Sequence, residues 1–295
     1  MIRVKKYKVG FVGLGIMGKP MVHNLLENKV QVYFYARKQK IIKSIEKRGG
    51  IFVSSVSDLP KHANILITNL PKTKDVELVT TGKVGMLDNL KKGSCVIDMS
   101  TISPKGAIQI NTELNKKGAF FIDAPVSGGE AGAISGNLSI MVGGDRKSFH
   151  KVKPILKMLG EKITYIGNSG SGQICKMCNQ VLVAQTIQAV SDIINISSKS
   201  RVDPNRIREA LLGGYANSKI LEIHGKRMID NDFKPGFKLS LHHKDLKIAK
   251  SFLSNIGIQL KSLNQVKKLM NLAESAGLSD LDSSAIHSIL EKTYK

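Results

Sequence analysis

The chain has 295 residues, of which 42% are hydrophobic and 23% are charged, as in ordinary globular proteins. This length allows two domains with a sizeable core, and no apolar run is long enough to span a bilayer, so no membrane partner is expected. The three cysteines are too few for a disulfide framework, and a cytoplasmic location is predicted.

The formal net charge of +22 is high, and it raises the hypothesis of binding to nucleic acid. The lysines are mostly isolated, however, and only 5% of residues are aromatic, so no basic stripe with stacking side chains is visible. We therefore expect solvated lysines spread over helices, and no nucleic-acid partner. Part of the positive charge suits an anionic cofactor and an anionic substrate.

The first element predicted is a short apolar strand, Lys8–Val12, followed by a glycine-rich turn and a helical pattern that runs to Asn28. In such a G-x-G-x-x-G turn, the glycines allow a tight bend, close approach of a pyrophosphate, and packing of helix on strand. The free N–H groups at the start of the helix would face the phosphates. A plain glycine turn is the alternative. The pattern predicts a dinucleotide site at Gly13, Leu14, Gly15, Ile16, Met17 and Gly18.

The second strand, predicted over residues 30–35, is followed by a cationic segment. A site selective for NAD usually has an acid at this strand end, to bind the ribose 2′-hydroxyl group. Here the sequence reads Tyr35-Ala36-Arg37-Lys38, with two cations and no acid. An arginine can hold a phosphate through two hydrogen bonds. Arg37 and Lys38 therefore favour NADP, with NAD as the alternative; solvated charges at the start of a helix would be the simpler interpretation.

Strands and helices then alternate. Strands are predicted over residues 64–68, 94–98, 119–122, 138–142 and 162–166, and helices over 39–48, 104–117 and 145–159. This βαβ series predicts an α/β fold with a Rossmann-type, doubly wound parallel sheet. Ligands bind such sheets beyond the carboxyl ends of the strands, where the segments 69–71, 100–101 and 123–129 lie. Within the last segment, a hydroxyl and backbone N–H groups suit a small carboxylate, unless it is only a glycine-rich turn. The residues concerned are Ser127, Gly128 and Gly129.

A long helix is predicted after Gly172, within residues 170–201, because nearly thirty residues without proline or glycine follow with apolar side chains at helical spacing. One charged residue, Lys176, lies near its start, and Asn179 and Gln180 share its face. A lysine among apolar neighbours and amides suits a proton donor. A lysine that extends its ammonium group to solvent is the alternative.

Beyond this helix the pattern is helical only. Helices are predicted over residues 203–213, 218–229 and 240–255, with two more before the end of the chain. The sequence therefore predicts a sheet domain over residues 1–167 and an all-helical C-terminal domain over 168–295, joined through the one long helix. The helical domain has more apolar surface than its helices can cover, which predicts an oligomer.

Five motifs, in order, resemble the β-hydroxyacid dehydrogenase family over nearly the whole chain. They are GLGIMGKPM (13–21), DMSTISP (98–104), DAPVSGG (123–129), GSGQICKMCNQ (170–180) and FKLSLHHKDL (237–246). Within the family, the chain is most similar to the tartronate semialdehyde (2-hydroxy-3-oxopropionate) reductases. The 3-hydroxyisobutyrate dehydrogenases are the alternative, although they usually have Asn where this chain has Gln180.

The resemblance implies an NADP(H)-dependent oxidoreductase that interconverts a small 3-hydroxy acid and its semialdehyde. It implies that Lys176 is the catalytic lysine and proton donor, and that Ser127, Gly128 and Gly129 form the loop that binds the substrate carboxylate. Asn179, whose amide would position the substrate and the lysine, and Gln180 are the other substrate-binding residues expected. Cofactor contacts are implied for Leu70, Pro71, Thr101 and Lys244, in addition to the glycine loop and the cationic segment. A homodimer or homotetramer is implied as well.

Two further interpretations bear on the chemistry. No metal is expected, because the neighbouring His242 and His243 would point in different directions on a helix. The alternative from another class is a non-catalytic binder that keeps the dinucleotide fold and uses its basic surface on nucleic acid. The joint presence of Lys176, Asn179 and Ser127 favours the enzyme, because a binder would not need that set of groups.

Overall fold

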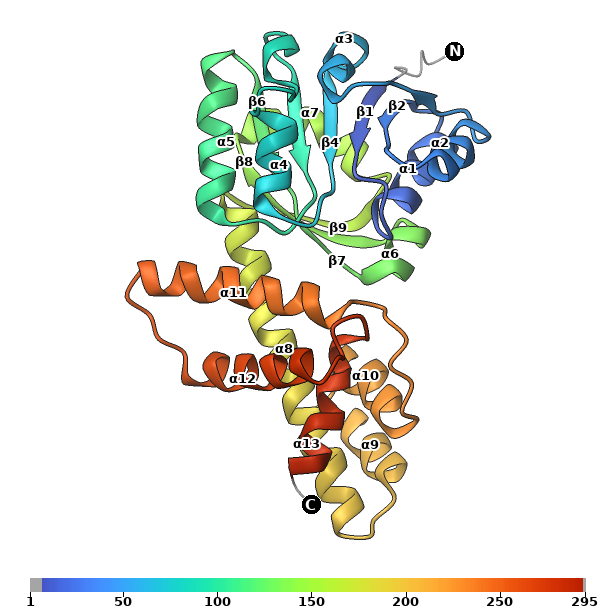
Figure 1. The fold of residues 1–295 in the computed structure, drawn as a ribbon, viewed down its shortest axis with the longest axis vertical. Helices are drawn as coiled ribbons and strands as arrows, with labels where there is room; N and C mark the ends of the chain where they lie inside the picture. The colour runs from blue at the N-terminus through green and yellow to red at the C-terminus, as the bar shows by residue number, and fades with distance from the viewer. Residues whose placement is uncertain (1–6, 294–295) are drawn as a thin grey trace. The chain divides into compact units, whose positions relative to one another are not determined.

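In a computed structural model, which describes residues 7–293, the chain divides into two compact units, with the division falling between Lys176 and Met177 inside one helix (Figure 1). The termini of the predicted domains, residues 1–6 and 294–295, lie outside the described residues, and the predicted boundary at 167/168 stays a prediction. No helix of the described part is both long and apolar enough to cross a membrane.

The first unit is built around one sheet. Its strands are β1 (Lys8–Val12), β2 (Gln31–Tyr35), β3 (Ile51–Phe52), β4 (Ile65–Thr68), β5 (Cys95–Asp98), β6 (Phe120–Asp123), β7 (Val126–Ser127), β8 (Leu138–Gly144) and β9 (Gly160–Gly167). Within the described residues, the strand order is β3-β2-β1-β4-β5-β6-β8-β7, and β9 pairs with β8. The order reverses direction after β3, because the chain returns past β1 to form β4, as a doubly wound sheet requires.

The helices of this unit are α1 (Gly18–Glu27), α2 (Gln39–Glu46), α3 (Leu59–His62), α4 (Thr73–Thr80), α5 (Pro104–Lys116), α6 (Gly129–Ser135) and α7 (Arg146–Leu156), with the 3₁₀ turns η1 (Val56–Asp58) and η2 (Leu87–Asn89). Their boundaries follow local signals. Ser103 caps α5, its hydroxyl accepting from the Gly106 N–H, with Pro104 in the first turn, and Asp145 caps α7 through the Ser148 N–H.

Helices cover both faces of the sheet, because strand side chains alternate between two cores. On β4, Ile65 and Ile67 belong to the core that includes α1, α2 and α7, whereas Leu66 belongs to the core that includes α3, α4 and α5. Strands buried on both faces read as continuous apolar runs, which is why β4 and β5 were predicted from the sequence. The two-residue strands β3 and β7 were not predicted. The predicted fold class is confirmed.

One detail of the sheet differs from the expectation that all its strands are parallel. Strands β1 to β6 are parallel to one another, but β8 is antiparallel to both β6 and β7. A parallel connection needs a crossover of a dozen or more residues. Only residues 128–137 link β7 to β8, and most of them form α6, so β8 returns in the opposite direction.

The second unit consists of helices around the remaining length of α8 (Ser171–Lys199). They are α9 (Pro204–Leu212), α10 (Lys219–Ile229), α11 (Leu239–Asn255), α12 (Lys261–Ser275), the 3₁₀ turn η3 (Ser283–Ile286) and α13 (His287–Thr293). The core is formed by one face of α8, including Ile187 and Val190, against apolar side chains such as Leu246 of α11 and Met270 of α12. The predicted long helix and the all-helical character of this part are confirmed.

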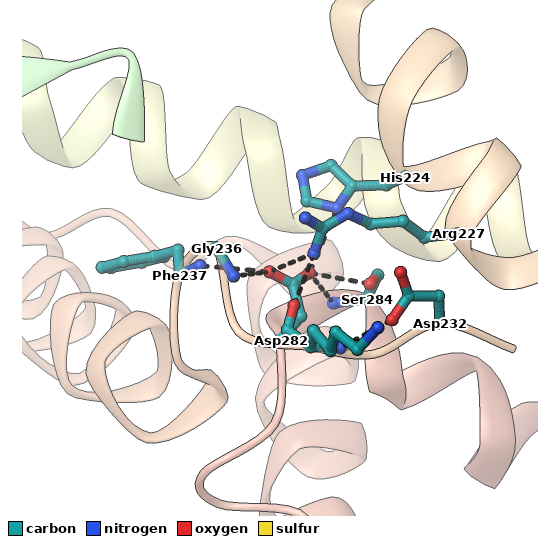
Figure 2. Close-up of polar contacts among 8 residues, drawn as sticks. His224, Arg227, Asp232, Gly236, Phe237, Asp282 and Ser284 are labelled. Atoms are coloured by element: carbon teal, nitrogen blue, oxygen red, sulfur yellow. Dashed lines mark hydrogen bonds and ion pairs between the residues drawn. The ribbon is translucent and has the colours of Figure 1, made fainter. Parts of the chain in front are cut away.

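A buried carboxylate ties three segments of the second unit together (Figure 2). Asp282, fully buried just before η3, lies 3.2 Å from His224 Nδ1 and 3.2 Å from Arg227 Nη1, both on α10. It also accepts hydrogen bonds from the backbone N–H groups of Gly236 and Phe237, each at 3.0 Å. The loop that leads into α11 is therefore fixed to α10 and η3 by one side chain.

Candidate active site

The glycine-rich turn joins β1 to α1, and its three glycines are constrained differently. Gly13 has φ +102°, and a Cβ there would overlap the carbonyl group of Asn69; a Cβ at Gly18 would overlap the carbonyl oxygen of Gly13. These two glycines are required by the protein's own packing. A Cβ at Gly15 would meet no atom within 4 Å, so this glycine leaves open space beside the loop. That is the space a pyrophosphate needs, so the turn fits the dinucleotide that its motif predicts.

The side chains of the other residues in the turn differ in exposure to solvent. Leu14 is buried, Met17 is half-buried and Ile16 is exposed. Helix α1 begins at Gly18, directly after the turn, so its first N–H groups lie next to that open space.

The cationic segment lies at the carboxyl end of β2. Val12 of β1 is paired with Tyr35 of β2, so the glycine turn and the cationic segment leave the sheet at adjacent positions. Arg37 and Lys38 are both exposed, in the bend before α2, and neither forms a salt bridge within residues 7–293. Two exposed cations at this strand end can contact a bound dinucleotide.

The turns after β4 and β5 are connected through one serine. Thr68 of β4 is paired with Asp98 of β5, so Leu70, Pro71 and Thr101 all follow adjacent strand ends. The Leu70 N–H donates to Ser100 Oγ at 2.8 Å, which joins the two turns. Pro71 is exposed and Thr101 half-buried, positions from which both can contact a ligand.

Beneath these turns lies a buried carboxyl group. Asp98 accepts hydrogen bonds from Thr68 Oγ1 at 2.8 Å and from Ser100 Oγ at 2.5 Å. Burial raises the pKa of Asp98 to about 7, against the hydrogen bonds from Ser100 and Thr68, which lower it. The serine hydroxyl therefore has a fixed direction, and with it the backbone next to Thr101.

The glycine pair Gly128-Gly129, directly after β7, leaves a second stretch of backbone open. Ser127 is half-buried on β7, where it is paired with Ser139 of β8. Gly128 has φ +135° and Gly129 has φ +61°, conformations that favour glycine, and both are exposed. A Cβ at Gly129 would meet no atom within 4 Å. A small anion can therefore approach this backbone closely.

Helix α8 begins against the end of β6. Asp123 accepts from the N–H groups of Gly170 at 2.8 Å and Gln173 at 3.1 Å, so it caps the helix. A Cβ at Gly172 would lie 2.5 Å from the Met141 oxygen and 2.6 Å from the Asp123 oxygen, so glycine is required at this joint. Lys176 follows one turn later and is buried, with 7% of its surface exposed.

In the second unit, α8 and α11 share a chain of polar contacts. Asn179 Nδ2 donates to Gln180 Oε1 at 2.9 Å, and Gln180 Nε2 donates to Asp245 at 2.6 Å. The same carboxylate lies 2.8 Å from Lys244 Nζ. The buried Asp245 therefore orients both Gln180, which is predicted to bind the substrate, and Lys244, which is predicted to contact the cofactor.

The first unit thus carries the glycine turn, the cationic segment, the turns containing Leu70 and Thr101, the Ser127 loop and Lys176. The second carries Asn179, Gln180 and Lys244. Sequence reasoning missed three residues that orient these groups, Asp98, Asp123 and Asp245. Each lies within a quoted motif, one to four residues from a predicted site residue, but burial and hydrogen bonding could not be read from the motif.

The two neighbouring histidines of α11 contact different elements, as their expected divergence implied. His242 Nε2 lies 3.1 Å from the Gln180 carbonyl oxygen, and His243 Nδ1 lies 2.8 Å from Glu274 of α12. Within the described part of the chain, no group of three or more His, Cys, Asp or Glu side chains is arranged to hold a metal ion.

The doubly wound sheet, the glycine turn and the residues at its strand ends define a dinucleotide-binding protein. Family models agree: residues 8–167 match the NAD-binding domain of 6-phosphogluconate dehydrogenase, and residues 170–290 match the NAD-binding domain of NADP-dependent 3-hydroxyisobutyrate dehydrogenase. The chain belongs to the β-hydroxyacid dehydrogenase family, which includes the 3-hydroxyisobutyrate dehydrogenases, and is an NAD(P)-dependent oxidoreductase. The family and enzyme class predicted from the sequence are confirmed.

Individual relatives span nearly the full chain. The chain is 41% identical to 2-hydroxy-3-oxopropionate reductase of Escherichia coli K12, covering 96% of this chain and 97% of that protein. It is 32% identical to the mitochondrial 3-hydroxyisobutyrate dehydrogenase of Mus musculus, covering 97% and 88%. The structure of Mycobacterium tuberculosis 3-hydroxyisobutyrate dehydrogenase with L-serine has a TM-score of 0.89 and 28% identity, covering 97% and 99%.

Proposed function

We propose that this protein is an NADPH-dependent reductase of a small carboxylate semialdehyde, with tartronate semialdehyde (2-hydroxy-3-oxopropionate) as the best candidate. The observation that carries the proposal is the buried Lys176, near the start of α8, in a chain 41% identical to the E. coli reductase. The motif DAPVSGGE and the Asn179-Gln180 pair support the same subgroup. Oxidation of 3-hydroxyisobutyrate is the second candidate, supported by the match of residues 170–290.

In the proposed reaction, Lys176 is the proton donor. The bound dinucleotide supplies the hydride that reduces the aldehyde carbon. Negative charge then develops on the carbonyl oxygen, and an ammonium group beside it both stabilises that charge and donates the proton. In the reverse direction, the neutral amine of Lys176 accepts the proton of the alcohol.

Substrate orientation follows from the remaining groups. Ser127 and the backbone at Gly128 and Gly129 are proposed to bind the substrate carboxylate, because a small anion can approach this open backbone. Asn179, one turn after Lys176 on the same helix, is proposed to position the substrate through its amide. Gln180 holds Asn179 in place through their hydrogen bond.

The proposed preference for NADPH rests on the cationic segment. Arg37 and Lys38 stand where an NAD-selective site has an acid, and Ala36 offers no carboxylate. The glycine turn would hold the pyrophosphate, with Leu70, Pro71 and Thr101 along the ribose and nicotinamide, and Lys244 as a further cofactor contact.

Initial rates test the proposal directly. Purified protein would be assayed with NADPH and with NADH against tartronate semialdehyde, methylmalonate semialdehyde and succinate semialdehyde, with propanal as a control that lacks the carboxylate. We expect the highest kcat/KM for tartronate semialdehyde with NADPH, and little turnover of propanal. A preference for methylmalonate semialdehyde would replace the first candidate by the second, and a failure to reduce any semialdehyde would overturn both.

A further inference from the structure

A glutamine in the first turn of α8 forms hydrogen bonds on both sides of Thr101, one of the proposed cofactor contacts. Gln173 is fully buried, and its side-chain amide uses both ends. Its Nε2 donates to the carbonyl oxygen of Ser100 at 2.9 Å, and its Oε1 accepts from the N–H of Ile102 at 3.0 Å. These are the residues on either side of Thr101. The amide therefore fixes the backbone of the Thr101 segment from both directions.

The same residue is part of the cap of α8. The backbone N–H of Gln173 donates to Asp123 Oδ2 at 3.1 Å, while Gly170 donates to the other oxygen of the same carboxylate. Lys176 follows three residues later, so Gln173 and Lys176 occupy successive turns on one side of the helix. Any rotation or sliding of this turn would move both side chains together.

The contacts extend further into the sheet. Ser100, whose carbonyl group accepts from Gln173, uses its hydroxyl to bond Asp98 and to accept from the Leu70 N–H. A continuous set of buried hydrogen bonds thus runs from the turn after β4, through the turn after β5, to the first turn of α8. Gln173 is the side chain in this set that joins the strand-end turns to the helix.

We propose that Gln173 is a positioning residue of the reductase: its amide holds Thr101 and the first turn of α8, and hence Lys176, in one fixed geometry. The inference rests on the proposed function, since it assumes that Lys176 donates the proton. The physical reason is that a buried amide must satisfy both its donor and its acceptor, and here both partners are backbone groups of a single short segment. A misplacement of about 1 Å in such a site can lower the rate by about a hundredfold.

Gln173→Leu removes both hydrogen bonds at nearly constant volume. We expect kcat for the semialdehyde to fall by about 10- to 100-fold, because the proton donor and the cofactor side of the site lose their common support. KM for the semialdehyde and Kd for NADPH should stay within about threefold, since Gln173 is fully buried and its amide is already bonded to the backbone of Ser100 and Ile102. The primary isotope effect with 4-deuterated NADPH should increase, because the chemical step becomes rate-limiting. Chain folding would be checked by circular dichroism and thermal unfolding.

Gln173→Glu gives a second readout that a merely structural role would not produce. The neutral carboxyl can donate to Ser100 and accept from Ile102, as the amide does, whereas the ionised carboxylate cannot donate. Burial and the neighbouring carboxylates of Asp123 and Asp98 raise the pKa of the introduced carboxyl. The ratio of variant to wild-type kcat should therefore increase as pH falls from 8 to 6. This variant also serves if Gln173→Leu is too unstable to assay.

Asn89→Leu is the matched control. Asn89 also donates its amide to a backbone carbonyl of the first unit, that of Ser57 at 2.8 Å, but both residues precede their strands, at the edge opposite Thr101. Its loss should lower thermal stability and leave kcat unchanged. Equal kcat for folded Gln173→Leu and wild type would overturn the inference, and so would a Gln173→Glu ratio that is independent of pH.

Lys176→Ala, assayed in parallel, separates this inference from the proposed function. A large loss of kcat in Lys176→Ala together with normal kcat in Gln173→Leu removes Gln173 from the mechanism and leaves the proton donor in place. Normal kcat in Lys176→Ala contradicts the proposed function itself, and with it the basis of the inference.

Discussion

At the scale of single residues, the proposed chemistry depends on one charged side chain that is buried. Lys176 is buried although lysine is almost never buried without a compensating reason, and it follows a helix start that Asp123 and Gly172 fix in position. A lysine that merely extends along the surface would have its ammonium group in water. Burial therefore favours the functional interpretation over the structural one.

Lys176→Ala is expected to lower kcat by about a hundredfold or more, the usual range for loss of a general acid. Lys176→Arg should not restore activity, because a guanidinium group does not release its proton near neutral pH. Affinity for NADPH should change little, since the proposed phosphate contacts lie at the glycine turn and Arg37. Steady-state kinetics measure kcat, and titration with NADPH measures the affinity for the cofactor. An unchanged kcat with a lower melting temperature would mean that Lys176 has only a structural role.

Arg37→Ala is expected to raise the Kd for NADPH by about tenfold or more and to leave that for NADH nearly unchanged. The reason is that a charge-assisted hydrogen bond to the 2′-phosphate is absent with NADH. Lys47→Ala, at the far end of α2 and equally exposed, serves as the control and should bind both cofactors normally. Binding can be followed by the fluorescence of the reduced nicotinamide, as the protein has no tryptophan. Tighter binding of NADH than NADPH by wild-type protein would contradict this assignment.

At the scale of elements, the second unit is held together at Asp282. This carboxylate joins α10, the loop before α11 and η3 (Figure 2), and α11 is the helix that carries Lys244 and Asp245. Burial alone would raise the pKa of Asp282, but hydrogen bonds from His224 and Ser284 outweigh it and hold the pKa well below its usual range. The ionised form is therefore the one that stabilises the unit.

Asp282→Asn is expected to lower the free energy of unfolding by about 2–4 kcal/mol near pH 7, because Arg227 loses its anionic partner and an amide N–H faces other donors. The contribution of a carboxylate with a lowered pKa is present above its unfolded pKa, about 4, and is lost as pH falls below that value. The difference in urea midpoint between wild type and variant should therefore shrink below pH 4.

The neighbouring Asp280→Asn provides the control for this measurement. The side chain of Asp280 is 85% exposed in its ion pair with Lys238, so its loss should have little effect on stability. Equal midpoints for Asp282→Asn and wild type at pH 7 would show that the cluster contributes nothing to the fold.

At the scale of the whole molecule, part of the apolar surface of the second unit stays uncovered. Leu182, Ile193 and Ile196 of α8 are exposed at 66%, 37% and 58%, and with Ala189 they recur at intervals of seven, four and three residues along one side of the helix. An exposed apolar stripe of this kind is typical of a protein interface. The oligomer predicted from the sequence remains a prediction, and this stripe is its most specific support.

Leu182→Glu is expected to shift the protein from an oligomer to a smaller species, because it places a charge within the proposed contact, at its most exposed apolar residue. Val84→Glu, at an equally exposed apolar position in a loop of the first unit, should leave the assembly unchanged. Light scattering coupled to gel filtration at micromolar concentration measures both variants. A monomeric wild-type protein would contradict the prediction.

The sequence by itself determined most of the order of elements in the described chain, the long helix and the family, but not the short elements β3, α3, α4 and α6. Strands such as Lys8–Val12 are continuous apolar runs between glycine turns, and helix starts such as Ser103-Pro104 carry their caps beside them, so local signals suffice. The motifs also marked Lys176 and the glycine turn, because their chemistry depends on residue type and spacing. The short strand Val126–Ser127 and the antiparallel direction of β8 were not predicted, since pairing partners are chosen by distant residues.

Only the tertiary structure decided which side chains support the site. Gln173 reads as one more helix residue, and nothing nearby in sequence indicates that its amide reaches Ser100 and Ile102, some seventy positions earlier. The same holds for Asp282, whose partners lie on α10 and in the loop before α11. A buried polar group must find its donors and acceptors wherever the folded chain brings them, so its role is set by packing and not by local sequence.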